Sequence, residues 1–356
     1  MSLLSMLKSI NIIESIVELG QIITYIITLY LILTLLFQKL IKINHVLFIL
    51  SITLIIDIAF SLSAYFPYVY NDLMYSFDDN WKLVGLYGNR NILATTIAFR
   101  IPFLVILAIR LKKYYIYLGS FILSVIGFFN IMLLSSRATF LAIILSFVFL
   151  VMLLIIKFIK DRTNILSTNK TILILYVIPC IIAYFMSVRA IDPGPQGNVA
   201  SRISTITSTS DVSKNTRLRY YSQSISHIMK NPILGAGIGN WKILSIKYDA
   251  ENIQNYIIPY NAHNDILEAT AETGIIGGLS FLLFYIVILY YLFQILITNL
   301  VSNDKYTYSL LLFIPFISYF IDLNLNFPSS RPANQFFLLM YICIIICFKI
   351  ELNESK

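Results

Sequence analysis

Long apolar runs limit this chain to a small set of folds, because about 20 consecutive apolar residues cross a bilayer as one helix. Inside a bilayer every backbone N–H and C=O must be paired within the protein, which a helix achieves along its own length. We therefore predict an all-α polytopic membrane helix bundle of about nine spans. The predicted spans are Gln21–Phe37, Val46–Phe66, Ile92–Ile109, Tyr114–Leu134, Thr139–Ile156, Thr171–Val188, Ile275–Ile297, Tyr308–Leu323 and Gln335–Phe348.

The composition supports this class. Hydrophobic residues make up 58% of the chain and charged residues 12%, whereas a soluble domain has roughly 25% charged residues. A soluble globular enzyme, a disordered chain and a nucleic-acid-binding domain are thereby excluded. The net charge of +8 does not indicate nucleic acid, since excess cations in a membrane protein set its orientation.

The loop cations predict sidedness. Loops on one side share a high content of lysine, and they alternate correctly across the spans. We predict that this side is cytoplasmic, with the N-terminus outside and the C-terminus inside. The other, outer side is richer in arginine, which favours an anionic ligand there because guanidinium grips phosphate and carboxylate with a planar fork. The alternative is contact with lipid headgroups. The lysine-rich loops contain Lys39, Lys42, Arg110, Lys112, Lys113, Lys157, Lys160, Arg162, Lys170 and Lys305.

This reading divides the chain into five parts. Residues 1–20 form an N-terminal interfacial segment, and residues 21–188 hold spans one to six. Residues 189–274 form a large periplasmic loop, residues 275–348 hold spans seven to nine, and residues 349–356 are a cytoplasmic tail. Loops longer than about 15 residues are uncommon unless they are functional, so the large loop is the first place to seek a site.

One stretch of that loop, Asn215–Lys230, is predicted to be helical, with Leu218, Tyr221, Ile225, Ile228 and Met229 on one face. Arg217 and Tyr221 stand four residues apart on this helix, and Arg219 projects elsewhere. One interpretation is a clamp on a pyrophosphate at the membrane surface. The other is a solvated helix face.

His263 precedes a helical run that ends near Glu272, and Asn264 or Asp265 is the expected N-cap. The positive end of the helix dipole lowers the pKa of a histidine there and keeps its ring neutral. A neutral histidine outside the membrane is suited to act as a general base. The alternative is a capping or interfacial histidine.

Three shorter outer turns each carry one arginine, namely Arg90, Arg137 and Arg331, and they share a side with His263. Asp57 and Arg100 differ, because they lie at equal depth in adjacent spans. Charges in the membrane interior are costly unless paired, so we predict a structural ion pair, with a substrate-path or proton role as the alternative. No metal-ligand spacing and no nucleotide-binding loop is present, so no cofactor is predicted.

The order of these pieces resembles the O-antigen ligase and polymerase-like superfamily. Members have Gly-Asn-Pro-Asn, Ser-Arg-Gly/Ala, an arginine segment with a glycine-rich turn, His-Asn-x-x-Leu-x-x-x-x-Glu-x-Gly, and Phe-Pro-x-x-Arg-Pro. Here Arg90 replaces the proline of the first. Members usually have more spans, which predicts a short member or missing N-terminal spans. The matching stretches are Gly88–Asn91, Ser136–Ala138, Arg217–Tyr221 with Asn231–Trp241, His263–Gly274 and Phe327–Pro332.

The resemblance implies a GT-C-like membrane glycosyltransferase that needs neither metal nor nucleotide. Its donor would be an undecaprenyl-pyrophosphate-linked glycan, and its acceptor a hydroxyl of lipid A-core. His263 and Arg217 would be catalytic, the first as the base that deprotonates the acceptor. Further residues would hold the pyrophosphate or glycan, namely Arg137, Arg219, Tyr221, Arg331, Arg90 and Asn264.

Other acceptors stay open at this point. A polymerase transfers the glycan to another repeat unit, and a protein O-oligosaccharyltransferase transfers it to serine or threonine. A non-enzymatic flippase or exporter of lipid-linked glycan is the reading from another class, and it predicts charges spread through the spans. An inactive, shortened family member is a further possibility.

Overall fold

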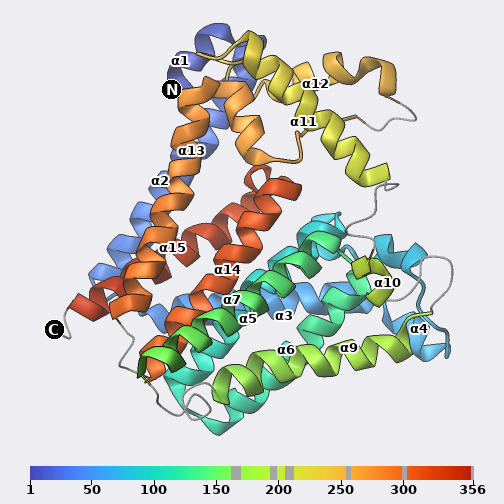
Figure 1. Ribbon diagram of the computed structural model, residues 1–356, viewed down its shortest axis with the longest axis vertical. Helices are drawn as coiled ribbons and strands as arrows, with labels where there is room; N and C mark the ends of the chain where they lie inside the picture. Colours follow the sequence, from blue (N-terminus) through green and yellow to red (C-terminus); the bar gives the residue numbers. More distant parts are fainter. Residues whose placement is uncertain (162–169, 193–198, 205–211, 254–257, 299–302, 354–356) are drawn as a thin grey trace. The chain divides into compact units, whose positions relative to one another are not determined.

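The computed structural model describes residues 1–161, 170–192, 199–204, 212–253, 258–298 and 303–353. Within these residues nine helical stretches are long and apolar enough to cross a membrane, which confirms the predicted all-α polytopic bundle (Figure 1). They are α2 (Ile12–Phe37), α3 (Ile43–Ser63), α5 (Arg90–Leu111), α6 (Tyr114–Leu134), α7 (Arg137–Asp161), the stretch Lys170–Ala190 that ends in α9 (Ile178–Ala190), α13 (Asp265–Thr298), α14 (Asn303–Leu325) and α15 (Pro332–Asn353).

Two boundaries differ most from the sequence prediction. Helix α2 begins at Ile12, where the side chain of Asn11 accepts a hydrogen bond from the Ile13 N–H, so it takes in much of the expected interfacial segment. Helix α13 begins at Asp265 and continues into the seventh span, with a break at Gly274. Parts of the predicted outer loop, residues 193–198, 205–211 and 254–257, lie outside the described residues.

The chain forms two compact units. One unit, here called the loop unit, contains residues 1–38, 209–290 and 323–343. The other, here called the span unit, contains residues 39–208, 291–322 and 344–356. Each is described by itself below.

The span unit is built around α5. Its residues from Ile92 to Ile109 are all buried, because their side chains are apolar almost throughout and α3, α6 and α7 pack against the helix. Gly88 adopts a left-handed conformation, and the Asn89 side chain then accepts hydrogen bonds from the N–H groups of Asn91 and Ile92. Arg90 is therefore the first helical residue, a position that suits the proline found in the family pattern.

Arg100 and Asp57 form a salt bridge in the middle of this unit, as their equal depth predicts. The Arg100 side chain is fully buried, and the Tyr87 hydroxyl donates a second hydrogen bond to Asp57 Oδ2 at 2.8 Å. The pair therefore joins α3 to α5 by a charge-assisted hydrogen bond. Removing either side chain would leave the other charge buried without its partner.

Replacing Asp57 by alanine is expected to lower stability by about 3–5 kcal/mol, because it leaves the Arg100 guanidinium buried without its carboxylate. The melting temperature of detergent-purified protein measures this loss. The double variant Asp57→Leu with Arg100→Met removes both charges and is expected to recover most of it. Equal melting temperatures for Asp57→Ala and wild type would show that the pair has no structural role.

The loop unit contains α1 (Ser2–Ser5), α2, α11 (Val212–Lys230), α12 (Trp241–Asp249) and the first part of α13. In Figure 1, α1, α12 and the start of α13 gather at the same end of this unit. A small core joins α11, α12 and α13. Trp241, Ala262 and Ala271 are buried in it, and Ile228, Leu244 and Tyr248 pack against them.

Helix α11 confirms the predicted helix, and its apolar face is largely exposed. Its apolar residues Leu218, Ile225 and Met229 are exposed. The buried side chains are instead Tyr220, Ser224 and His227. Aromatic and polar side chains contact the buried face of α11. His227 Nδ1 lies 3.2 Å from the Tyr248 hydroxyl of α12, so the polar face of α11 packs inward.

Candidate functional site

His263 sits immediately before α13 in a left-handed conformation, with a φ of 56°. The turn is held on its C-terminal side by Asn264, whose Oδ1 accepts a hydrogen bond from the Leu267 N–H at 3.0 Å. Asn264 is therefore the N-cap of α13, as predicted, and its Nδ2 also donates to Asn324 Oδ1 at 3.4 Å. These contacts fix the direction in which the backbone presents the His263 ring.

Aromatic side chains surround the His263 ring. Tyr220 of α11 stacks against it at a centroid distance of 5.9 Å, and Phe327 meets it edge-on at 5.0 Å. Burial among these groups lowers the pKa of His263 to about 4, and the positive charge of Arg217 acts in the same direction. A hydrogen bond to the backbone of Leu325 opposes both effects. The ring is therefore neutral at physiological pH, with desolvation as the largest cause and Arg217 as the second.

Arg217 and Tyr221 both belong to this cluster. Arg217 lies within electrostatic reach of His263, and its Nη2 donates to Asn326 Oδ1 at 3.4 Å. The Tyr221 hydroxyl lies 3.0 Å from the His263 carbonyl oxygen and 2.7 Å from that of Asn324. Tyr221 therefore holds the backbone that carries His263, which favours a positioning role over the predicted contact with substrate.

The turn after α14 supplies the remaining members. The Arg331 guanidinium lies over the Phe327 ring at 5.1 Å, so Phe327 contacts both Arg331 and His263. The Ser329 N–H donates to Asp265 Oδ2 at 2.9 Å, which ties this turn to the start of α13. The loop unit thus brings together His263, Arg217, Tyr221, Asn264 and Arg331.

Arg219 is placed differently. Its Nε lies 2.8 Å from Asp249 Oδ1, its Nη2 donates to Asp249 Oδ2 at 3.1 Å, and Asp249 is buried. This bidentate pair joins α11 to α12. The structure therefore favours a structural role for Arg219, and the predicted contact with pyrophosphate loses its support.

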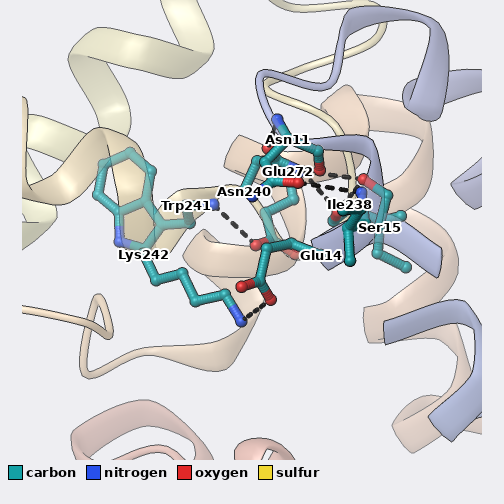
Figure 2. Close-up of polar contacts among 9 residues, drawn as sticks. Asn11, Glu14, Ser15, Ile238, Asn240, Trp241, Lys242 and Glu272 are labelled. Carbon is teal, nitrogen blue, oxygen red and sulfur yellow. Dashed lines mark hydrogen bonds and ion pairs between the residues drawn. The ribbon is translucent and has the colours of Figure 1, made fainter. Parts of the chain in front are cut away.

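A glycine-rich turn, Gly235–Gly239, packs against α13 where that helix is interrupted. The Ile275 N–H donates to Pro232 O at 2.8 Å instead of continuing the helix. The carbonyls of Ala271 and Glu272 are then available to accept, at 2.9 Å each, from the N–H groups of Ala236 and Gly237. The Glu272 carboxylate accepts from the Trp241 N–H at 2.9 Å, as Figure 2 shows. Glu268 similarly accepts from the Ala262 N–H at 2.7 Å.

Gly274 makes this interruption possible. Its φ is 77°, and a Cβ at this position would lie 2.1 Å from the Ile233 carbonyl oxygen. Gly274→Ala is therefore expected to destabilise the protein by about 1–3 kcal/mol, read as a lower melting temperature in detergent. Gly20→Ala in α2 is the matched control, since a Cβ there meets nothing within 4 Å. Equal effects of the two substitutions would contradict this account of the turn.

Arg90 and Arg137 belong to the span unit, where a third arginine joins them. Arg137 is the first residue of α7, and α10 (Val199–Ser204) packs against that helix. Arg202 of α10 lies over the Phe77 ring at 5.8 Å, and both Arg202 and Arg137 act electrostatically on Arg90. Sequence reasoning missed Arg202, because it stands in a segment without a motif. The span unit thus carries its own cationic cluster, which we call the arginine cluster.

Among the described residues, no group of three or more His, Cys, Asp or Glu side chains is arranged to bind a metal ion. The acidic side chains near His263 are instead occupied with backbone N–H groups. Asp265, Glu268 and Glu272 each accept such a hydrogen bond. Glu272 is the glutamate of the quoted sequence pattern, yet only the structure shows that its carboxylate holds the Trp241 N–H.

Residues 122–282, a little under half of the chain, match the O-antigen ligase family. The matched stretch contains Arg137, Arg217 and His263, whereas Arg90 and Arg331 lie outside it. A comparison with curated proteins finds no match. The match over residues 122–282 confirms the resemblance drawn from the motifs and supports the O-antigen ligase superfamily for this part of the chain.

Proposed function

We propose that this multi-pass membrane protein is an O-antigen ligase-like glycosyltransferase. Its donor is a glycan carried on undecaprenyl pyrophosphate, its acceptor is a hydroxyl of lipid A-core, and the reaction takes place on the periplasmic face of the inner membrane. The family match over residues 122–282 supports a membrane glycosyltransferase of ligase or polymerase type in general. We infer the donor and the acceptor from the resemblance of the motifs, and the face from the loop charges; the side chains around His263 fit this chemistry.

The observation that carries the proposal is a neutral histidine beside an arginine in a partly apolar setting. His263 has a pKa of about 4, so its ring is free to accept a proton at neutral pH. Arg217 lies close enough to act on it electrostatically. A base and a cation placed together suit a transfer in which a hydroxyl loses a proton while an anion departs.

The proposed reaction balances in one step. The acceptor oxygen forms a bond to the anomeric carbon of the glycan, and the bond from that carbon to the pyrophosphate oxygen breaks. His263 takes the acceptor proton, and undecaprenyl pyrophosphate leaves with the electron pair. Negative charge grows on the leaving oxygen, so fixed guanidinium groups stabilise the transition state more than the ground state.

Arg217 and Arg331 are the cations of the loop unit that suit this role. The pyrophosphate would also raise the pKa of His263 when it binds, because a nearby negative charge favours the protonated ring. The base would then work closer to neutral pH than in the free protein. In the span unit we assign the arginine cluster, Arg90, Arg137 and Arg202, to the same class of anionic ligand.

The acceptor is tested by the surface polysaccharides of a deletion strain complemented with wild type or with His263→Ala. If the protein is a ligase, the deletion strain and the strain with His263→Ala are expected to show free core together with accumulated lipid-linked polymer, and wild type is expected to restore the capped core. Core capped with a single repeat would instead assign a polymerase. An unchanged lipopolysaccharide profile would overturn the ligase assignment and direct the search to protein acceptors.

A further inference from the structure

The N-terminal residues Met1–Glu18, here called the strap, turn their serines inward. Ser5 and Ser15 are fully buried. The Ser5 Oγ accepts a hydrogen bond from the Ile238 N–H at 3.1 Å, and the Ser15 Oγ donates to the Ile238 carbonyl at 2.6 Å. Both backbone groups of Ile238 are thus paired with the strap, more than 200 residues away in the sequence.

Asn240 is the centre of this contact, and its side chain is fully buried. Its Oδ1 accepts from the Asn11 N–H at 2.7 Å, and its Nδ2 donates to the Ser15 Oγ at 2.9 Å (Figure 2). Beside it, Lys242 Nζ lies 2.5 Å from Glu14 Oε2. An amide that pairs both its oxygen and its nitrogen with one segment fixes the orientation as well as the distance of that segment.

The glycine-rich turn is shaped to receive the strap. Gly237 has a φ of 91°, and a Cβ there would lie 2.3 Å from the Ser9 Oγ. Gly239 has a φ of 74°, and a Cβ there would lie 2.9 Å from the Glu14 carbonyl oxygen. The strap backbone therefore lies directly against the turn, at a separation that side chains would prevent.

The outer side of the strap is apolar. Leu3, Leu7 and Ile13 are 67%, 80% and 67% exposed, whereas Ser5 and Ser15 are buried. This is the inverse of a water-soluble segment and is typical of one that faces acyl chains. The strap continues into α2, a candidate span whose side chains are also largely exposed.

The turn connects the strap to His263. Trp241, next to Asn240, donates its N–H to the Glu272 carboxylate, and the Gly237 N–H donates to the Glu272 carbonyl oxygen. Glu272 stands on the first part of α13, which begins directly after His263. We propose that the strap is a positioning element for His263, with Asn240 as its main contact. This inference rests on the proposed function.

Asn240→Ala tests the strap in the full-length protein, with purified lipid-linked glycan as donor. Positioning a base affects the rate of the chemical step, so kcat is expected to fall about 10- to 100-fold while the KM for donor changes little. Asn71→Ala, which removes an exposed asparagine on the span unit, is the matched control and is expected to keep wild-type kcat. Wild-type kcat in Asn240→Ala would overturn the proposal.

A charge exchange covers the case in which Asn240→Ala fails to fold. Glu14→Lys and Lys242→Glu each place like charges together and are each expected to lower kcat. The double exchange restores the pair and is expected to recover wild-type kcat. Single variants that equal wild type, or a double variant no better than either, would overturn the proposal.

The two proposals fail separately. Transfer by His263→Ala at the wild-type rate would contradict the proposed function. Loss of transfer in His263→Ala, combined with wild-type kcat in every folded strap variant, would leave the function standing and reject the strap.

Discussion

His263→Ala is expected to lower glycan transfer by about 10²- to 10⁴-fold, the usual contribution of a general base. The ring lies within electrostatic reach of Arg217, and its pKa of about 4 keeps it unprotonated in neutral solution. The measurement is the initial rate of transfer from a lipid-pyrophosphate glycan to acceptor, with detergent-purified protein.

His227→Ala is the control for a general effect of losing a histidine from this unit. His227 is buried on α11, with Nδ1 3.2 Å from the Tyr248 hydroxyl, so its loss is expected to lower the melting temperature rather than to abolish transfer. Transfer by His263→Ala at close to the wild-type rate would remove His263 from the mechanism.

Arg217→Gln is expected to have the second-largest effect, about 10²- to 10³-fold on kcat, because one fixed donor to the developing anion is lost. It should also move the pH profile. The positive charge of Arg217 lowers the pKa of His263, so its removal raises that pKa from about 4 towards the ordinary 6.5. Burial still holds it below that value.

The sign of this shift follows from which form of the ring is active. Neutral His263 is the base, so kcat/KM is expected to be flat above about pH 5 and to fall as the pH drops through about 4. In Arg217→Gln this fall should begin at a higher pH. Arg217→Lys keeps the charge and should leave the acid limb in place. An acid limb that does not move in Arg217→Gln would contradict the assigned neighbour.

The spans could be predicted from the sequence because bilayer thickness sets a length that apolar runs must meet. The buried face of α11 could not be predicted in the same way. Leu218 and Met229 are exposed while Ser224 is buried. The contacts that select the buried face come from another helix, as in the 3.2 Å contact between His227 Nδ1 and the Tyr248 hydroxyl of α12, and the periodicity of α11 does not encode them.

The candidate site shows the same division. His263, the N-cap residue Asn264, Arg217 and Tyr221 lie in local sequence motifs, so the sequence could propose them as site residues. The partner of Arg219 is Asp249, thirty positions away on another helix, and no local rule selects it. Arg202 and the serines of the strap are likewise brought into place only by tertiary contacts.

The central claim is that this protein breaks the bond between glycan and lipid pyrophosphate rather than moving the intact lipid. The most direct measurement follows undecaprenyl pyrophosphate release by purified wild-type protein in lipid nanodiscs, with and without lipid A-core. The account predicts release that depends on acceptor, equals the glycan transferred, and is lost in His263→Ala. Intact donor recovered in full in the presence of acceptor would contradict it and favour a flippase or exporter.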